Sequence, residues 1–147
     1  MNKSVLISIR PNWCKKILSG YKTLEIRKTR PKLQPPFKCY IYQTMTGYVS
    51  KSKENDILVQ IAYGKVIGEF VCDKIERIDV PYPAYQKELP VRILKESCIP
   101  YYDLHRYAYH DDVFGWHISD LKIYDRPEDL SEYGLDRPPQ SWRYINR

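Results

Sequence analysis

The chain has 147 residues, and a composition of 43% hydrophobic and 29% charged residues is ordinary for a globular protein. This length favours one domain over residues 1–147. No stretch approaches the ~20 apolar residues that a membrane span needs, and the N-terminus lacks the features of a signal peptide. We therefore expect a cytoplasmic protein with no membrane partner.

The cysteine pattern argues against a metal site. The four cysteines are far apart, and no histidine stands at ligand spacing from them. A chain of this length does not need a disulfide framework. We expect free thiols at Cys14, Cys39, Cys72 and Cys98, with no metal and no cofactor.

The positive charge is concentrated in the first part of the chain. The net charge is +6, but residues 1–60 carry 12 Lys or Arg against 3 acidic residues, a net of +9. The remainder carries 12 basic and 15 acidic residues, a net of −3. This asymmetry favours a basic face that binds a polyanion. The alternative is that the two parts interleave in space, so that their fields cancel.

The first elements in chain order are a strand and a helix. Residues 4–9 form a short β-rich run, which predicts a buried strand. A helix follows, because Pro11 suits a first helical turn and Gly20 suits the position after the last turn. Its apolar residues, Trp13 and Ile17 among them, share one side.

Residues 22–28 alternate as a half-buried strand does. Leu24 and Ile26 share the face that we expect to pack on the core. Glu25 and Arg27 share the opposite face, outside the core, where a carboxylate lies beside a guanidinium.

The rest of the chain adds strands around a helical insertion. We expect a bulge or bend at Gly68, because glycine within a strand often marks one. The remaining predictions are strands at residues 37–43, 65–79 and 113–125, helices at 91–97 and 101–107, an exposed loop at 44–56, an undecided strand or helix at 57–63, and a break at 126–130 before a proline-rich tail. This order predicts an α+β fold, in which a mixed sheet forms a small β-barrel with flanking helices and a helical insertion around residues 90–110.

The run Gly20-x-Lys22-x-x-Glu25-x-Arg27 resembles the G-x-K-x-x-E-x-R signature of the ASCH family. It lies between an amphipathic helix and a proline-rich turn. Further similar parts are residues 6–11, 65–70 and 115–118, so the resemblance spans most of the chain, although its N-terminal motif alone is specific. The resemblance implies a PUA-like barrel and an association with RNA.

The chemistry of the motif residues suits an anionic ligand. Gly20 permits a left-handed helix end, so that the chain turns and presents Lys22 at the rim of the sheet. The Lys22 ammonium suits a phosphate or a developing oxyanion, and the Arg27 fork suits a carboxylate, a phosphate or a base edge. Glu25 can accept from a base amino group, accept a proton or pair with Arg27. The structural alternative is an exposed salt bridge worth ~0–1 kcal/mol.

In a first hypothesis the protein binds an RNA strand or a nucleotide in a basic cleft. Basic groups hold the phosphates and tyrosines stack on unpaired bases, each contributing ~1–3 kcal/mol. The candidate nucleic-acid-binding residues are Lys22, Arg27, Tyr21, Lys28, Arg30 and Arg10. Further candidate stacking residues are Tyr40, Tyr42, Tyr48 and the cluster Tyr101, Tyr102, Tyr107 and Tyr109.

In a second hypothesis the protein is a small hydrolase, with Lys22 and Glu25 as catalytic residues. The resemblance to ASCH proteins implies either an amidohydrolase that removes an acyl group from N4-acetylcytidine or a ribonuclease. The amidohydrolase type uses the motif lysine, a threonine nucleophile and a glutamate. Lys22 matches the lysine, but Glu25 occupies the nucleophile position and Thr23 is one residue out of register. A ribonuclease would need a Tyr or His near Lys22, and Tyr21, His105, His110 and His117 are available.

Overall fold

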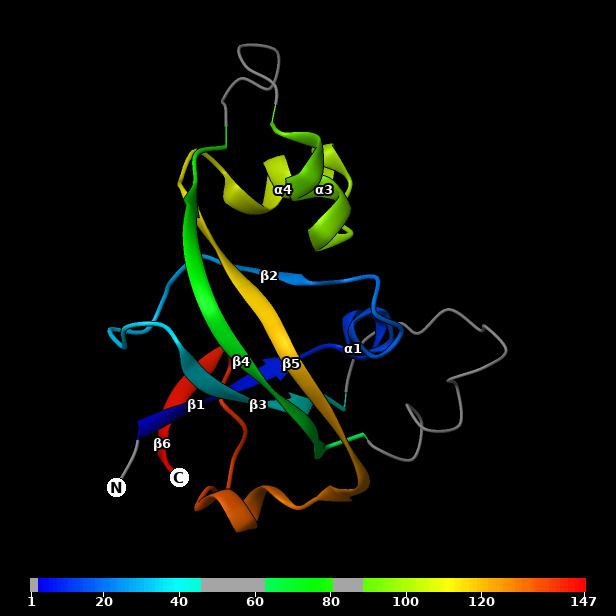
Figure 1. Cartoon of the computed structure of the whole chain (residues 1–147), viewed down its shortest axis with the longest axis vertical. Helices are drawn as coiled ribbons and strands as arrows, with labels where there is room; N and C mark the ends of the chain where they lie inside the picture. Colours follow the sequence, from blue (N-terminus) through cyan, green and yellow to red (C-terminus); the bar gives the residue numbers. More distant parts are fainter. Residues whose placement is uncertain (1–2, 46–62, 81–88) are drawn as a thin grey trace.

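The computed structural model describes residues 3–45, 63–80 and 89–147. These residues form a mixed six-stranded sheet in the order β2-β5-β4-β3-β1-β6, accompanied by helices (Figure 1). The strands are β1 (Lys3–Ile9), β2 (Leu24–Arg27), β3 (Phe37–Gln43), β4 (Lys65–Ile78), β5 (Val113–Glu128) and β6 (Trp142–Asn146). The helices are α1 (Pro11–Leu18), α3 (Val91–Ser97), α4 (Tyr101–Ala108) and the 3-10 helix η2 (Leu130–Tyr133).

This architecture confirms the predicted α+β class and its helical insertion. The strands predicted at 4–9, 37–43 and 65–79 agree with β1, β3 and β4, and the three predicted helices agree with α1, α3 and α4. Strand β5 continues into the break predicted at 126–130 and ends at Glu128. Strand β6 was not predicted, because its five residues gain their strand conformation by pairing with β1, about 140 residues away in sequence. The predictions at 46–56 and 57–62 fall outside the described residues.

Strand β1 is buried on both faces because the sheet separates two apolar clusters. It pairs in parallel with β3 and antiparallel with β6. Val5 and Ile7 face a cluster that includes Cys14 of α1 and Trp116 of β5. Leu6, between them, faces a second cluster around η2 and β6. The six consecutive residues at 4–9 are all buried, which explains the continuous β-rich run.

The glycine expected to mark a bend in β4 lies at an irregularity of the sheet. The β4–β5 ladder shifts register between Val66 and Gly68, which confirms the prediction. A Cβ atom at Gly68 would lie 2.5 Å from the backbone oxygen of Lys122 on β5. Glycine is therefore required here by the close approach of two backbones.

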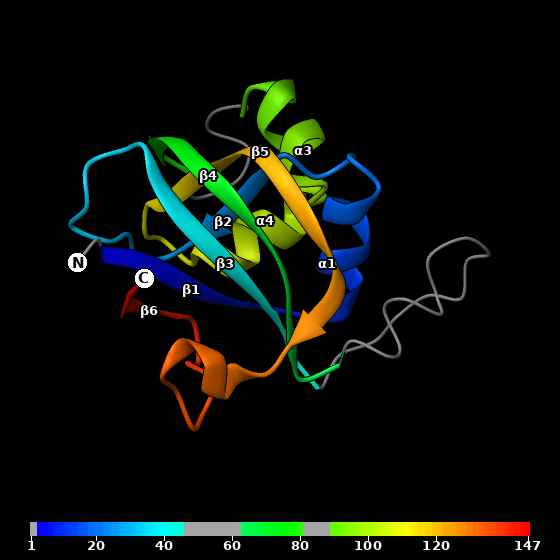
Figure 2. The ribbon, with the colours of Figure 1, turned by 60° about the horizontal axis from the view of Figure 1, so that its bottom comes forward.

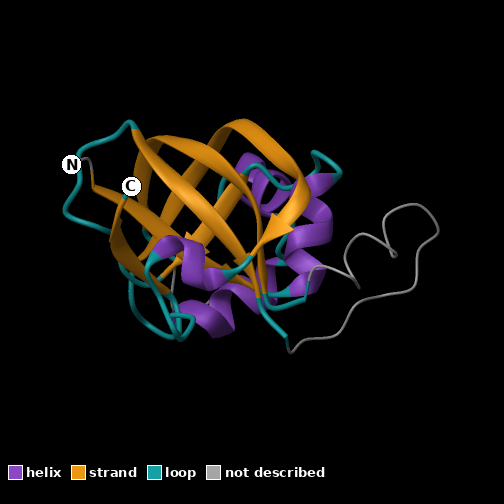
Figure 3. Cartoon of the chain, turned by 90° about the horizontal axis from the view of Figure 1, so that it is seen from below, coloured by secondary structure: helices purple, strands orange, loops and turns teal. Residues whose placement is uncertain are grey.

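The helical insertion covers the outer face of β2. Leu24 and Ile26 pack with Ile93 of α3 and with Leu104 and Ala108 of α4 in a third apolar cluster. The amide of residue 23, just before β2, also donates to a backbone carbonyl of α3 at 2.9 Å. In Figure 1 the two helices lie at the same end of the long strands β4 and β5, above β2, and Figure 3 shows them in purple against the strands.

The predicted β-barrel is not confirmed. Within the described residues, backbone hydrogen bonds do not join the two end strands β2 and β6, so the curled sheet stays open between them (Figure 2). Side chains bridge this seam instead. Trp142 Nε1 donates to Thr29 Oγ1 at 2.9 Å, and the Lys32 amide donates to the Tyr144 hydroxyl at 2.7 Å. Arg27 makes a third connection, described below.

Candidate functional site

The turn after α1 positions the first motif residues. Gly20 has a φ of +80°, in the left-handed region, which confirms the expected helix end. The amides of Tyr21 and Lys22 both donate to the Lys16 carbonyl at 3.1 Å, so the turn closes back on the helix. This turn directs the Lys22 side chain inward. Lys22 is 1% exposed, and the expectation that it lies at the rim of the sheet is wrong.

The Lys22 ammonium is enclosed by three groups from different parts of the chain. It donates to the Ser97 carbonyl at the end of α3, at 2.7 Å. It lies 3.4 Å from Oε1 of Glu25 and 4.7 Å from the centre of the Trp13 ring on α1. A buried ammonium needs such partners, because an unpaired charge costs several kcal/mol in a protein interior.

Glu25 joins Lys22 to Arg27. Its Oε2 atom accepts from Arg27 Nη2 at 3.0 Å, while Oε1 faces Lys22. Arg27 also donates to the Ser8 carbonyl at 2.6 Å and to Ser141 Oγ at 3.1 Å. These three motif residues therefore form one continuous polar group, which we call the motif network (Lys22, Glu25 and Arg27).

The second face of β2 is thus enclosed rather than exposed. The expectation of a face outside the core is wrong, because Glu25 is 4% exposed. Glu25 is paired across the ladder with the fully buried Trp116, so both side chains point into the curled sheet. The curl brings Ser8 and Ser141 against Arg27 from the other edge. The exposed salt bridge considered as an alternative is consequently also wrong.

Electrostatics within the motif network keep Glu25 ionised. Burial alone would raise the pKa of Glu25, but the positive charges of Lys22 and Arg27 outweigh burial and lower it. Burial also lowers the pKa of Lys22, and the adjacent Glu25 carboxylate only partly offsets this effect. With two cations to one carboxylate, the network has an excess of positive charge when Lys22 is protonated.

The other predicted binding residues differ in exposure and in their contacts. Lys28 and Arg10 are exposed, and Tyr21 is 75% exposed. Arg30 is half-buried and donates to the carbonyls of Pro31 and Leu33, at 3.2 Å and 3.4 Å, so its guanidinium holds the proline-rich turn.

The candidate stacking tyrosines separate into two groups. Tyr40 and Tyr42 are 5% exposed and pack in the core near η2, which removes them as stacking surfaces for a base. Tyr102, Tyr107 and Tyr109 of the helical insertion present more of their rings to solvent. Tyr101 is half-buried against α3, and Tyr48 falls outside the described residues.

The histidine candidates lie on β5, on α4 and directly after α4. His117 Nε2 lies 2.8 Å from Glu76 Oε1, and the same carboxylate binds Arg92 of α3. His105 is half-buried on α4, and His110 is exposed after it. Thr23, considered as a displaced nucleophile, is exposed just before β2.

Sequence reasoning missed three contributors to the site. Trp13 was assigned to the apolar side of its helix, and nothing in that pattern indicates its contact with an ammonium. Ser97 contributes a backbone carbonyl, which has no side-chain signature in a sequence. Ser141 lies more than 100 residues from Arg27, in a tail to which no element was assigned.

The described residues contain neither a metal-ligand cluster nor a helix that could span a membrane. Within residues 3–45, 63–80 and 89–147, no group of three or more His, Cys, Asp or Glu side chains is placed to hold a metal ion. The helices in these ranges are too short and too polar to cross a membrane.

Comparison with known proteins identifies the fold. No protein-family model matches the chain, and no curated protein matches it. Three solved structures of an ASCH protein from Zymomonas mobilis are similar. A mutant is 21% identical with a TM-score of 0.70, covering 98% of this chain and 89% of that one. The ASCH structure for which no mutation is named is 20% identical with a TM-score of 0.68, covering 98% of this chain and 88% of that one. A second mutant is 20% identical with a TM-score of 0.65, covering 99% and 92%. The resemblance of the motif to ASCH proteins is therefore confirmed at the level of the fold: nearly the whole chain adopts the fold of an ASCH structure.

Proposed function

We propose that this protein binds an RNA strand or a nucleotide beside the segment Gly20–Arg27. The observation that carries the proposal is the convergence of Lys22, Glu25 and Arg27 into one enclosed network with more positive than negative groups. The fold shared with ASCH structures supports the same class of ligand. This ligand class also agrees with the net charge of +6 and with the concentration of basic residues at 1–60.

The motif network favours an anion for a reason beyond its net charge. Burial disfavours the charged form of Lys22, and Glu25 is shared with Arg27. A phosphate close to the ammonium would relieve this cost and raise the pKa of Lys22. The exposed Lys28 and Arg10 would attract the RNA strand by their positive charge. The motif network would then fix the position of one phosphate along that strand.

The proposal is tested by binding of labelled single-stranded RNA at several salt concentrations. We expect affinity to fall steeply with salt, and Lys22→Met to weaken binding by about tenfold or more. Lys95→Met is the matched control, because Lys95 is an exposed lysine of α3. A melting curve for each variant establishes that it is folded. Equal binding by the two folded variants, or no binding by the wild type, would refute the proposal.

A second candidate function is hydrolysis, and the lowered pKa of Lys22 is the observation that favours it. Proton transfer is most efficient when the pKa of the group lies near the working pH, and desolvation moves lysine in that direction. Glu25, ionised and 3.4 Å away, can hold the lysine in place.

The substitution Lys22→Arg distinguishes the two functions. Arginine keeps the positive charge but does not release a proton in this pH range. A binding protein should retain RNA affinity to within about tenfold. A hydrolase should lose acetate release from N4-acetylcytidine, or RNA cleavage, while the substrate still binds. If the wild type turns over neither substrate, hydrolysis of these compounds is excluded.

A further inference from the structure

We propose that Tyr107 and Lys28 act together as the recognition unit for one unpaired nucleotide of the RNA, with the Tyr107 ring stacking on the base and the Lys28 ammonium binding the adjoining phosphate. This inference rests on the proposed function and deepens it: it makes the preferred ligand a single-stranded segment. It also assigns a ligand-binding role to the helical insertion.

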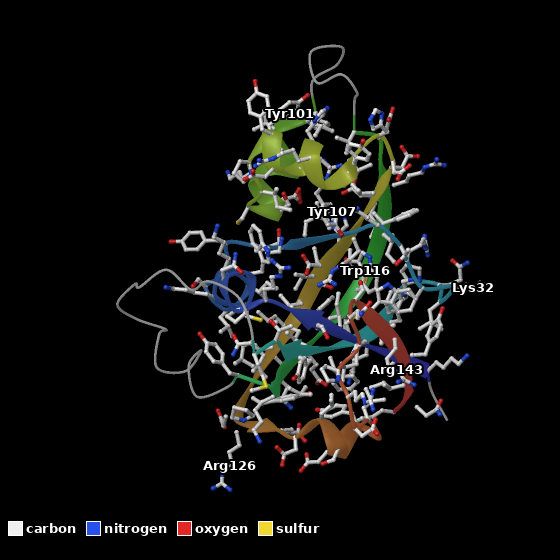
Figure 4. All side chains as sticks on the ribbon, turned by 180° about the vertical axis from the view of Figure 1, so that it is seen from behind. Lys32, Tyr101, Tyr107, Trp116, Arg126 and Arg143 are labelled. Carbon is white, nitrogen blue, oxygen red and sulfur yellow. The ribbon has the colours of Figure 1, made fainter. Side chains whose placement is uncertain are left out.

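The placement of Tyr107 brings the insertion to the motif. Tyr107 lies in the last turn of α4, and its neighbours Leu104 and Ala108 are buried against β2. Lys28 directly follows β2, and its Nζ atom lies 5.0 Å from the centre of the Tyr107 ring. Figure 4 shows Tyr107 in the region between α4 and β2, while Tyr101 lies at the other end of α4.

The Tyr107 hydroxyl lies within the field of the motif network. Burial raises the pKa of Tyr107, and Glu25 raises it further, whereas Arg27 and the backbone of Lys28 lower it. Tyr107 nevertheless remains 39% exposed. The residue is therefore held by α4 and Lys28 while part of its surface is available to a ligand.

The other exposed tyrosines have different neighbours. Tyr102 is 73% exposed and packs edge-on against Tyr101, and Tyr109 is 70% exposed and packs edge-on against His110. Exposure alone would rank these two residues above Tyr107. The combination of an aromatic ring, an ammonium and the adjacent charged network singles out Tyr107.

The chemistry of this pair selects an unpaired nucleotide. A stacking ring needs a free base face, which the interior of a duplex does not offer. Aromatic stacking tolerates any base, while an ammonium recognises the phosphate that every nucleotide carries. The pair should therefore prefer single strands to duplexes with little dependence on base sequence.

The test measures the dissociation constants of a labelled single-stranded RNA of ~12 nucleotides and of the same RNA annealed to its complement. We expect tighter binding of the single strand. Tyr107→Ala should weaken it by about tenfold, and Tyr107→Phe should retain binding because the ring remains. Lys28→Ala should reduce the magnitude of the salt slope by ~0.7, the value for one phosphate contact on a single strand.

Tyr102→Ala is the matched control, as it removes a more exposed ring from the same helix. Binding by Tyr107→Ala equal to that of the wild type or of Tyr102→Ala would overturn the inference, and so would tighter binding of the duplex. If Lys22→Met weakens binding and Tyr107→Ala does not, this inference fails alone. If the wild type binds neither RNA, the proposed function fails with it.

Discussion

Two carboxylates in this protein each contact two basic side chains, in different surroundings. Glu25 contacts Lys22 and Arg27 inside the curled sheet, with 6% of its side chain exposed. Glu76, on β4, contacts Arg92 and His117, with 14% of its side chain exposed. The Arg92 partner is itself 51% exposed, whereas the Lys22 partner is 1% exposed.

The two groups have similar numbers of ion pairs but differ in their access to water. We expect this access to determine how much each group stabilises the folded protein. Burial dominates the pKa of Lys22, and the loss of one partner would leave a buried charge with too few partners. Around Glu76, hydrogen bonds from Arg92 are the main cause of the pKa shift, and solvent can replace them. Removing one member of the group around Glu25 should therefore cost much of the stability that the whole group provides. Removing one member of the group around Glu76 should cost little.

The largest expected effect is that of Glu25→Gln. The amide keeps the size of the side chain but removes the carboxylate that the buried Lys22 and the half-buried Arg27 share, which should lower the free energy of unfolding by ~3–5 kcal/mol. Urea unfolding measures this change. Glu96→Gln on α3 is the control, because Glu96 pairs with Arg92 at 3.4 Å near the surface. Similar losses in both variants would abolish the distinction between the two groups.

We expect a loss of intermediate size in the free energy of unfolding when the pH is lowered. The pKa of Glu76 is lowered from 4.5 to about 2 by hydrogen bonds from Arg92 and His117. The unfolded chain therefore binds the proton first, so the stabilisation is present above pH 4.5 and disappears as the pH falls towards 2. Glu25 has a lowered pKa too and contributes with the same sign.

The variant Glu76→Gln shows how much of this acid-induced loss of stability is due to the Glu76 carboxylate. We expect the difference in unfolding free energy between wild type and variant to be larger at about pH 7 than at about pH 3. Urea unfolding at both values provides the measurement. A difference that does not change with pH would mean that Glu76 is not ionised by its partners in the folded protein.

The smallest expected effect is that of Arg92→Ala. Exposed ion pairs contribute ~0–1 kcal/mol, because water solvates the partners that remain. His117 also stays beside Glu76, 2.8 Å away. Thermal unfolding should place this variant close to the wild type. A loss as large as that of Glu25→Gln would show that the group around Glu76 anchors α3 more firmly than its exposure indicates.

Local sequence patterns predicted most of the fold, because strands β1, β3 and β4 and the helices α1, α3 and α4 have clear periodicity or proline boundaries. The same alternation misled the interpretation of β2. A period of two shows which residues share a face, but only long-range folding decides what covers that face. The segments that cover Glu25 and Arg27 include Ser8 and Ser141, far apart in the sequence.

The motif predicted which residues come together, but not their surroundings. Lys22, Glu25 and Arg27 were grouped because they belong to one motif, although strand alternation alone would place Lys22 on the face opposite Glu25 and Arg27. The contacts with the Ser97 carbonyl and with the Trp13 ring depend on how α1 and α3 pack against that segment. No local pattern encodes such a meeting, so the burial of Lys22 could not be derived from sequence.

The connection made by Arg27 across the open seam has a consequence for the precision of the fold. A ladder of backbone hydrogen bonds repeats every two residues, so two strands joined by one can slide and pair again in a shifted alignment. The planar Arg27 guanidinium has no such repeat. Its donors reach both the Ser8 carbonyl and the Ser141 hydroxyl in this one alignment of the two sheet edges. The Arg27 guanidinium therefore fixes the alignment of the two sheet edges at this point of the seam. It ties the position of the segment before the C-terminal strand to a residue of the motif.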